Sequence, residues 1–265
     1  MKALITGIVV VVMASPSWAF LGLPYAQEAV VDQGDMRITA GLTMGQFPDS
    51  DGDADLDIMM LGVRFGYGVM DGLELFGGIG LVDFDFDIDD DDAPDIDFGN
   101  EPYVQIGGLY TLPLDLPFDL ALRGSFGFAR LEDSVRESEE VPMPGGALTT
   151  INMRGDIEID IISLNAGLLA SKALNPMLSV YGFGGFSHNR AKMSMEAQVT
   201  SDDSFVMELI QMEGLDRMSE SETETSTDLA LAGGLIVNLA EQFSLYAEVA
   251  HIDELWASVG GRFRF

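Results

Sequence analysis

Carboxylates are the chemically active side chains that this chain concentrates most strongly. They form two clusters, one with acids at every second position and one uninterrupted: Asp49, Asp51, Asp53 and Asp55, then Asp89, Asp90, Asp91 and Asp92. Hard cations such as Ca²⁺ and Mg²⁺ take oxygen ligands of this type. The first cluster departs from an EF-hand loop, because Gly52 stands at its fourth position and no glutamate at its twelfth. We therefore expect no built cofactor site; loosely bound Ca²⁺ or Mg²⁺ and a merely solvated acidic surface are the two interpretations.

Histidine chemistry has two candidates, His188 and His251. Ser187 precedes His188, but adjacent residues of a strand point to opposite faces, so the two make a poor nucleophile and base pair. His251 and Asp253 would share one face of a strand. We expect no enzymatic activity and no catalytic residue; a hydrolase built on His251 and Asp253 is an alternative.

Charge and cysteine content exclude several classes of function. The chain has 265 residues, a formal net charge of −31 and no cysteine. Such a charge opposes ordinary electrostatic binding to nucleic acid or to an anionic lipid surface. The absence of cysteine excludes disulfides and thiolate metal sites.

The N-terminus has the pattern of a secretory signal peptide. Lys2 is followed by the apolar run "ALITGIVVVVMA" and then by "SPSWA", which ends at Ala19. About 11 apolar residues are too few to span a bilayer of roughly 30 Å. We therefore predict a signal peptide over 1–19 and a periplasmic segment over 20–35, with a retained anchor as the alternative.

The rest of the chain alternates with the period of β-strands. Phrases such as "LELFGGIGL" and "LSVYGFGGF" have an apolar residue at every second position and a mixed opposite face. Short turns at 70–72, 113–117, 172–176 and 240–242 alternate with long polar loops at 48–54, 89–99, 134–149 and 199–225. This rhythm predicts an all-β, antiparallel up-and-down barrel over 36–265, with acidic extracellular loops. We place its ten strands at 36–47, 55–69, 73–88, 100–112, 118–133, 150–171, 177–198, 226–239, 243–252 and 255–265; eight strands are the alternative.

Alternation also assigns side chains to the barrel interior. If the face that ends in Phe265 points outward, six charged residues point inward: Arg37, Arg64, Arg123, Arg262, Glu74 and Glu248. A barrel of about this size has an interior that side chains can fill. We expect these residues to form a charged plug through Arg–Glu pairs, rather than to line a wide channel.

The ending "LWASVGGRFRF" resembles the closing strand of Gram-negative outer-membrane barrels. It alternates apolar residues up to Phe263 and Phe265, and with the signal peptide it is similar to the small outer-membrane barrel domains that include the opacity-type porins. The resemblance implies an outer-membrane location, contact with lipid and lipopolysaccharide, and recognition of these two phenylalanines by the barrel-assembly machinery. His251 and nearby acids are loosely similar to the omptin proteases, although chain order and spacing differ.

We therefore expect a non-enzymatic, monomeric outer-membrane barrel that acts as an envelope or surface-interaction protein and binds no nucleic acid. A narrow passive pore is the main alternative. A protease or lipid-modifying enzyme at the barrel rim is the third.

Overall fold

The described part of the computed structural model comprises residues 28–29, 31–48, 54–88, 97–142, 148–212, 216–252 and 254–265. Its strands are β1 (Met36–Pro48), β2 (Ala54–Met70), β3 (Leu73–Ile88), β4 (Asp97–Thr111), β5 (Asp119–Pro142), β6 (Leu148–Asn175), β7 (Leu178–Ser201), β8 (Arg217–Asn238), β9 (Phe243–Ile252) and β10 (Glu254–Arg264), with helix α2 (Ser204–Met212) between β7 and β8. The predicted signal peptide lies outside the described residues. Among the described residues, no helix is long and apolar enough to cross a membrane.

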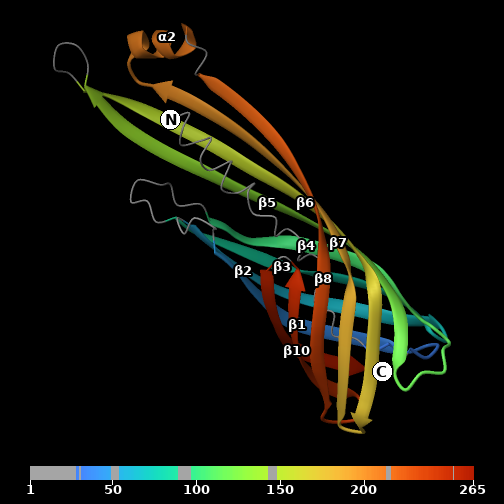
Figure 1. Ribbon diagram of the computed structural model, residues 1–265. Coiled ribbons are helices and arrows are strands. Elements are labelled where there is room, and N and C mark those ends of the chain that lie inside the picture. Colours follow the sequence, from blue (N-terminus) through green and yellow to red (C-terminus); the bar gives the residue numbers. More distant parts are fainter. Residues whose placement is uncertain are drawn as a thin grey trace.

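The strands close into one antiparallel barrel (Figure 1). Each strand pairs with its neighbours in sequence, and β1 pairs with β10 to complete the ring, for example through Leu42 and Val259. Closure leaves no unpaired sheet edge within the ring, which a chain spanning hydrocarbon requires. The predicted ten-stranded antiparallel barrel is confirmed.

Two of the predicted long loops are wrong. β5 continues to Pro142 and pairs with β6 without a break as far as Leu148, and β8 begins already at Arg217. The charged and hydroxyl-rich sequence of these stretches favours a loop, yet main-chain pairing with the next strand makes them strands. Figure 1 shows β5–β8 rising beyond the rest of the barrel, with α2 at the tip. We call this part, from the level of Arg130, Asp160, Lys192 and Thr223 outward, the extension.

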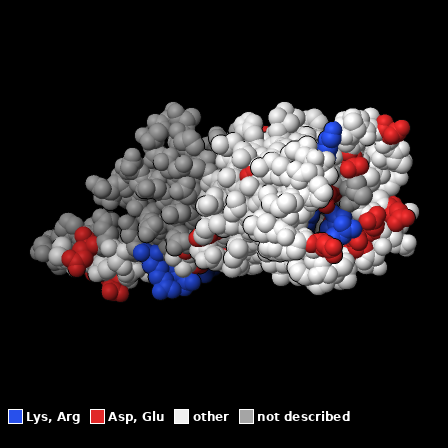
Figure 2. Space-filling view, turned by 90° about the horizontal axis from the view of Figure 1, so that it is seen from below, with Lys and Arg blue, Asp and Glu red and all other residues white. Residues whose placement is uncertain are grey.

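The two faces of the wall exchange polarity along β6. Its outward residues are apolar from Ala170 to Ile162 and polar from Asp160 outward, while its inward residues change from Ser163 to the fully buried Ile161 and Ile159. The outward apolar side chains form a belt around the barrel, as contact with hydrocarbon requires. In Figure 2 the middle of the molecule accordingly shows few charged side chains, and the charges gather toward its ends.

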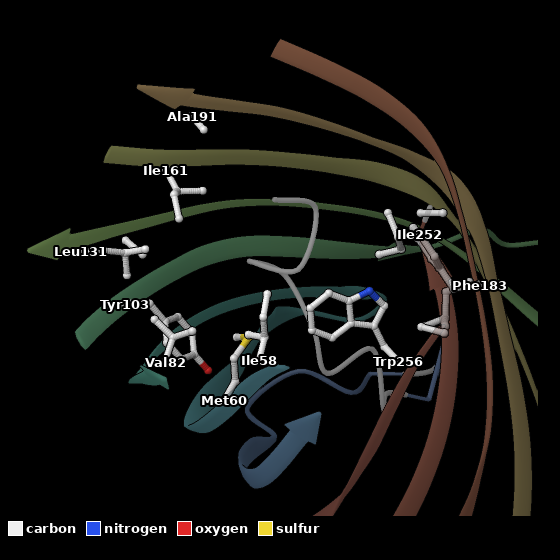
Figure 3. Packing of buried hydrophobic residues seen from close by; sticks show 14 of the residues in the cluster. Ile58, Met60, Val82, Tyr103, Leu131, Ile161, Phe183, Ala191, Ile252 and Trp256 are labelled. Atoms are coloured by element: carbon white, nitrogen blue, oxygen red, sulfur yellow. The ribbon is translucent and has the colours of Figure 1, made fainter. Parts of the chain in front are cut away.

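The outer half of the interior is apolar. Met60, Val82, Leu131, Ile161 and Trp256 belong to one cluster of buried side chains. Figure 3 shows the labelled members directed inward from strands around the ring. Burial of this apolar surface stabilises the closed ring by about 25 cal/mol per Å².

Interior aromatic rings lie against glycines of the neighbouring wall. A Cβ at Gly41 would clash with the hydroxyl of Tyr246, and one at Gly107 would clash with the ring of Phe76 and with the main chain of Gly124. The lack of a side chain at these glycines therefore lets large rings fill the interior while the strands stay at their normal spacing.

Helix α2 covers the inner face of the extension near its tip. Val206 and Ile210 pack with Val199 of β7. Asp203 caps the helix, since its carboxylate accepts hydrogen bonds from the amides of Phe205 and Val206 at 2.8 and 3.1 Å. The apolar side of the short helix is thus held on the extended sheet.

Candidate functional site

The charged residues of the interior form the candidate site, and all six expected to point inward are buried, with at most 8% of each exposed. Arg37 of β1 reaches across β2 to Glu74 of β3, with Nη1 to Oε2 at 3.4 Å. Arg37 also lies 3.6 Å from Asp35. A buried ion pair of this kind mainly avoids the cost of an unpaired charge.

Arg262 forms its ion pair with an acid that precedes the first strand. Its Nη2 lies 3.4 Å from a carboxylate oxygen of Glu28, and the same atom donates to the hydroxyl of Ser244 at 3.4 Å. Glu28 also accepts a hydrogen bond from Ser179 at 3.2 Å. Glu248 instead accepts a hydrogen bond from the hydroxyl of Tyr181 at 2.7 Å.

The other two inward arginines lie on aromatic rings. The guanidinium carbons of Arg64 and Arg123 stand 5.1 and 5.2 Å from the centre of the Phe76 ring. Arg123 also lies 5.9 Å from the Phe183 ring. Such cation–π contacts stabilise a charge that has left water, so the two arginines pack as part of a filled interior.

Residues 28–29 and 31–35 lie on the inner side of the barrel at the short-turn rim. Ala29 and Val31 are at most 2% exposed. The Ala29 amide donates to the Ser171 hydroxyl at 2.9 Å, and Val31 accepts from the Gly72 amide at 2.8 Å. Since Ser171 lies on β6 and Gly72 in the β2–β3 turn, this segment spans the barrel end, and we call it the floor.

Ion pairs hold the end of the floor next to β1. Arg264 of β10 lies 2.6 Å from Asp35 and 3.2 Å from Asp32. Strand alternation could not predict the roles of Glu28, Asp32 and Asp35, because these acids precede the first strand. Their clue is that four buried arginines stand with only two buried acids, Glu74 and Glu248, among the described strand residues, which leaves positive charge to be neutralised from elsewhere.

The acidic clusters fall almost entirely outside the described residues. Asp49, Asp51, Asp53 and Asp89–Asp92 are not described, and Asp55 is placed in β2 without its side chain. Within the described ranges no group of three or more His, Asp or Glu could hold a metal ion. Weak binding of Ca²⁺ or Mg²⁺ by these clusters stays a prediction.

The histidines and Ser187 point to different faces. Ser187 is fully buried and inward, whereas His188 is exposed on the outer face, where its Nδ1 lies 2.8 Å from the Thr227 hydroxyl. His251 is also exposed on the outer face, next to Leu231 and Leu255 on the neighbouring strands. Asp253 is not described.

At the base of the extension, β8 carries the acids Glu222 and Glu224 on its inner side. Partial burial, and then the charge of Glu222, raise the pKa of Glu224. At the opposite rim, Phe263 and Phe265 stand outward with their ring centres 4.7 Å apart.

A family model described as "Outer membrane protein beta-barrel domain" matches residues 77–256. The chain belongs to this family of outer-membrane β-barrels. It lies in the outer membrane of a Gram-negative bacterium, where its strands span the bilayer and its apolar belt contacts lipid.

This chain is similar in structure to several solved outer-membrane proteins. The attachment invasion locus protein Ail of Yersinia pestis is 17% identical, with 88% of this chain and 99% of that chain covered and a TM-score of 0.34. The protease OmpT of Escherichia coli is 9% identical, with 91% and 99% covered and a TM-score of 0.42. The translocator domain of the autotransporter NalP from Neisseria meningitidis is 11% identical, with 88% and 89% covered and a TM-score of 0.51. The likeness to the NalP domain shows the fold alone. No curated protein matches the sequence.

Proposed function

We propose that this outer-membrane barrel is a closed, non-enzymatic surface protein that presents its extension for interactions outside the cell. The observation that carries the proposal is the filled interior. Buried arginines are answered by Glu74 and Glu28 or lie on aromatic rings, and the floor crosses the barrel end beneath them. Ions would have to displace these contacts to pass.

The length of the extension supports a role at the cell surface. A transmembrane β-strand needs about 9–11 residues, whereas β6 has 28. Leu148–Ile159 alone would extend roughly 40 Å beyond the lipid belt at about 3.3 Å per residue. Four long paired strands are more than closure of a barrel requires, and their polar outer face suits a surface that water and partners reach.

Two further features belong to the proposal. The acidic clusters that precede β2 and follow β3 in the sequence would add negative charge to the extracellular side and attract divalent cations weakly. Catalysis has no part in it, since His188 and Ser187 stand on opposite faces of β7.

Conductance in a planar bilayer tests the closed interior against the passive pore. Wild-type protein should show little steady current. Replacing Glu28 and Asp35 together with alanine should leave Arg262 and Arg264 less well held and raise the frequency of open events severalfold. Asp115→Ala, in an exposed loop at the same rim, is the control and should behave as wild type.

A large, steady current through the wild type that the double substitution leaves unchanged would contradict the proposal and favour the pore. Cleavage of peptides or lipid by the purified wild type, lost in His251→Ala, would favour the enzyme instead.

A further inference from the structure

The basic residues on the extracellular side are confined to one surface. Within the described ranges, every Lys or Arg of the extension, together with Arg190 just below it, lies on the outward face of β5–β8 and is exposed: Arg130, Arg136, Arg154, Arg190, Lys192 and Arg217. The described parts of β1–β4, β9 and β10 have no Lys or Arg toward this end. In a chain with a net charge of −31, this wall balances its acids with bases, since the same face carries six described acids: Glu132, Glu140, Asp156, Glu158, Asp160 and Glu196.

Two of these cations stand directly at the edge of the apolar belt. Along the outward face of β7, the 62% exposed Phe186 is followed by His188, Arg190 and Lys192. Arg190 is paired across the sheet with the apolar Ile162 of β6. The cations therefore begin at the height where hydrocarbon contact ends and lipid headgroups begin.

The charges of Arg190 and Lys192 are not neutralised by ion pairs with other described residues. Lys192 faces Asp160 across the sheet, but that carboxylate is taken by Arg130, whose Nε donates to it at 2.8 Å. Neither Arg190 nor Lys192 forms an ion pair with another described residue, although Arg130 and Arg154 both do. Two cations at every second position stand about 7 Å apart on one face and repel each other.

Hydroxyl groups stand beside the two cations. Across from β7, the outward face of β8 changes from Leu229 to three threonines, Thr227, Thr225 and Thr223. Thr225 is the cross-strand partner of Arg190, and Thr223 is the partner of Lys192. The surface thus has two cations and a row of hydroxyls above a border of exposed Phe186 and Leu229.

We propose that this surface, formed by Phe186, His188, Arg190 and Lys192 of β7 with Thr223, Thr225 and Thr227 of β8, binds the phosphate groups of lipopolysaccharide directly. Arg and Lys are the side chains that bind phosphate best, and threonine hydroxyls donate further hydrogen bonds to phosphate or sugar. Phe186 and Leu229 contact the acyl chains below. A soluble polyanion does not fit this position, because headgroups already occupy the height of Arg190.

Direct pairing differs from cation bridging, and the experiment separates them. Binding of the folded protein in detergent to phosphorylated lipopolysaccharide is measured in EDTA, which removes bridging Ca²⁺ and Mg²⁺. Arg190→Gln and Lys192→Gln together should weaken binding by about tenfold for each cation removed, since each charge-assisted contact contributes at least that factor. Dephosphorylated lipopolysaccharide should bind the wild type as weakly as it binds the double variant.

Lys172→Gln is the matched control, because Lys172 is an exposed lysine of β6 near the opposite rim; its affinity should equal that of the wild type. Inorganic phosphate in large excess should compete poorly, since it lacks the acyl chains. If the double variant does not fold, as judged by heat-modifiable gel migration, each single variant is measured instead. Wild-type affinity in the variants, equal binding of the dephosphorylated glycolipid, or loss of all binding in EDTA would overturn the proposal.

Discussion

At the scale of single residues, the stability of the interior depends on acids that form ion pairs with buried arginines. Arg37 is 5% exposed and Glu74 is 2% exposed, and the two charges stand 3.4 Å apart. Taking one partner away leaves the other charged in a site that water does not reach, which costs more than the pair itself contributes.

Glu74→Gln should therefore destabilise the folded barrel by about 3–5 kcal/mol, the range for breaking a buried pair. Asp35, at 3.6 Å from Arg37, would offset part of the loss and place the result at the lower end. Urea unfolding in detergent measures the free energy of unfolding. Glu220→Gln, an exposed glutamate of the extension, is the control, and an equal effect of both changes would contradict the assignment.

At the scale of strands, close contact between wall and ring depends on glycine. Phe76 of β3 leans over Gly107 of β4, and the main-chain oxygen of Gly124 on β5 lies on the same side. A side chain at Gly107 must move both a buried ring and a neighbouring strand, because interiors are closely packed.

We expect Gly107→Ala to cost about 1–3 kcal/mol, the usual range for overpacking. Gly182→Ala is the matched control, since a Cβ there would meet its nearest atom, the Ala232 oxygen, at an ordinary 3.6 Å. The midpoint of thermal unfolding should fall in the first variant alone. If the two midpoints fall together, a general loss of strand flexibility is the cause and the ring contact is not.

At the scale of the whole molecule, the barrel is completed by its last residue. The Phe265 amide donates to the Met36 carbonyl at 2.9 Å, so the last residue lies beside the start of β1, where β10 closes on β1. The Phe265 side chain, 62% exposed, points outward.

Phe265→Ala keeps this main-chain hydrogen bond and removes the aromatic ring. If the assembly machinery recognises the Phe265 ring, the fraction of protein inserted in the membrane should fall severalfold, while the amount synthesised stays unchanged. Heat-modifiable gel migration of membrane extracts measures the inserted fraction. Phe118→Ala removes another outward ring near the same rim and should insert normally. Normal insertion of Phe265→Ala would refute a role for the terminal ring in assembly.

The chain's own pattern determined the architecture, because a side-chain period of two and the need to pair every backbone group inside a bilayer leave few solutions. Alternation also assigned Arg37, Arg64, Arg123 and Arg262 to the inward face, where the structure has them buried. Alternation did not predict the extension. Stretches such as "SESETETST" are polar enough to resemble loops, and they become strands because they pair with β7.

Tertiary structure alone decided which charges meet. Strand alternation gives the face of a residue but not its height or its partner across the ring, so it could not bring Glu28 to Arg262 or Tyr181 to Glu248. The charge of one part of the surface could not be predicted from the sequence either. A net charge of −31 predicts repulsion from anionic lipid, yet it is a sum over the whole chain. Electrostatic interactions are screened beyond about 10 Å, so the positions of Arg190 and Lys192 at the lipid edge decide what that part of the wall attracts.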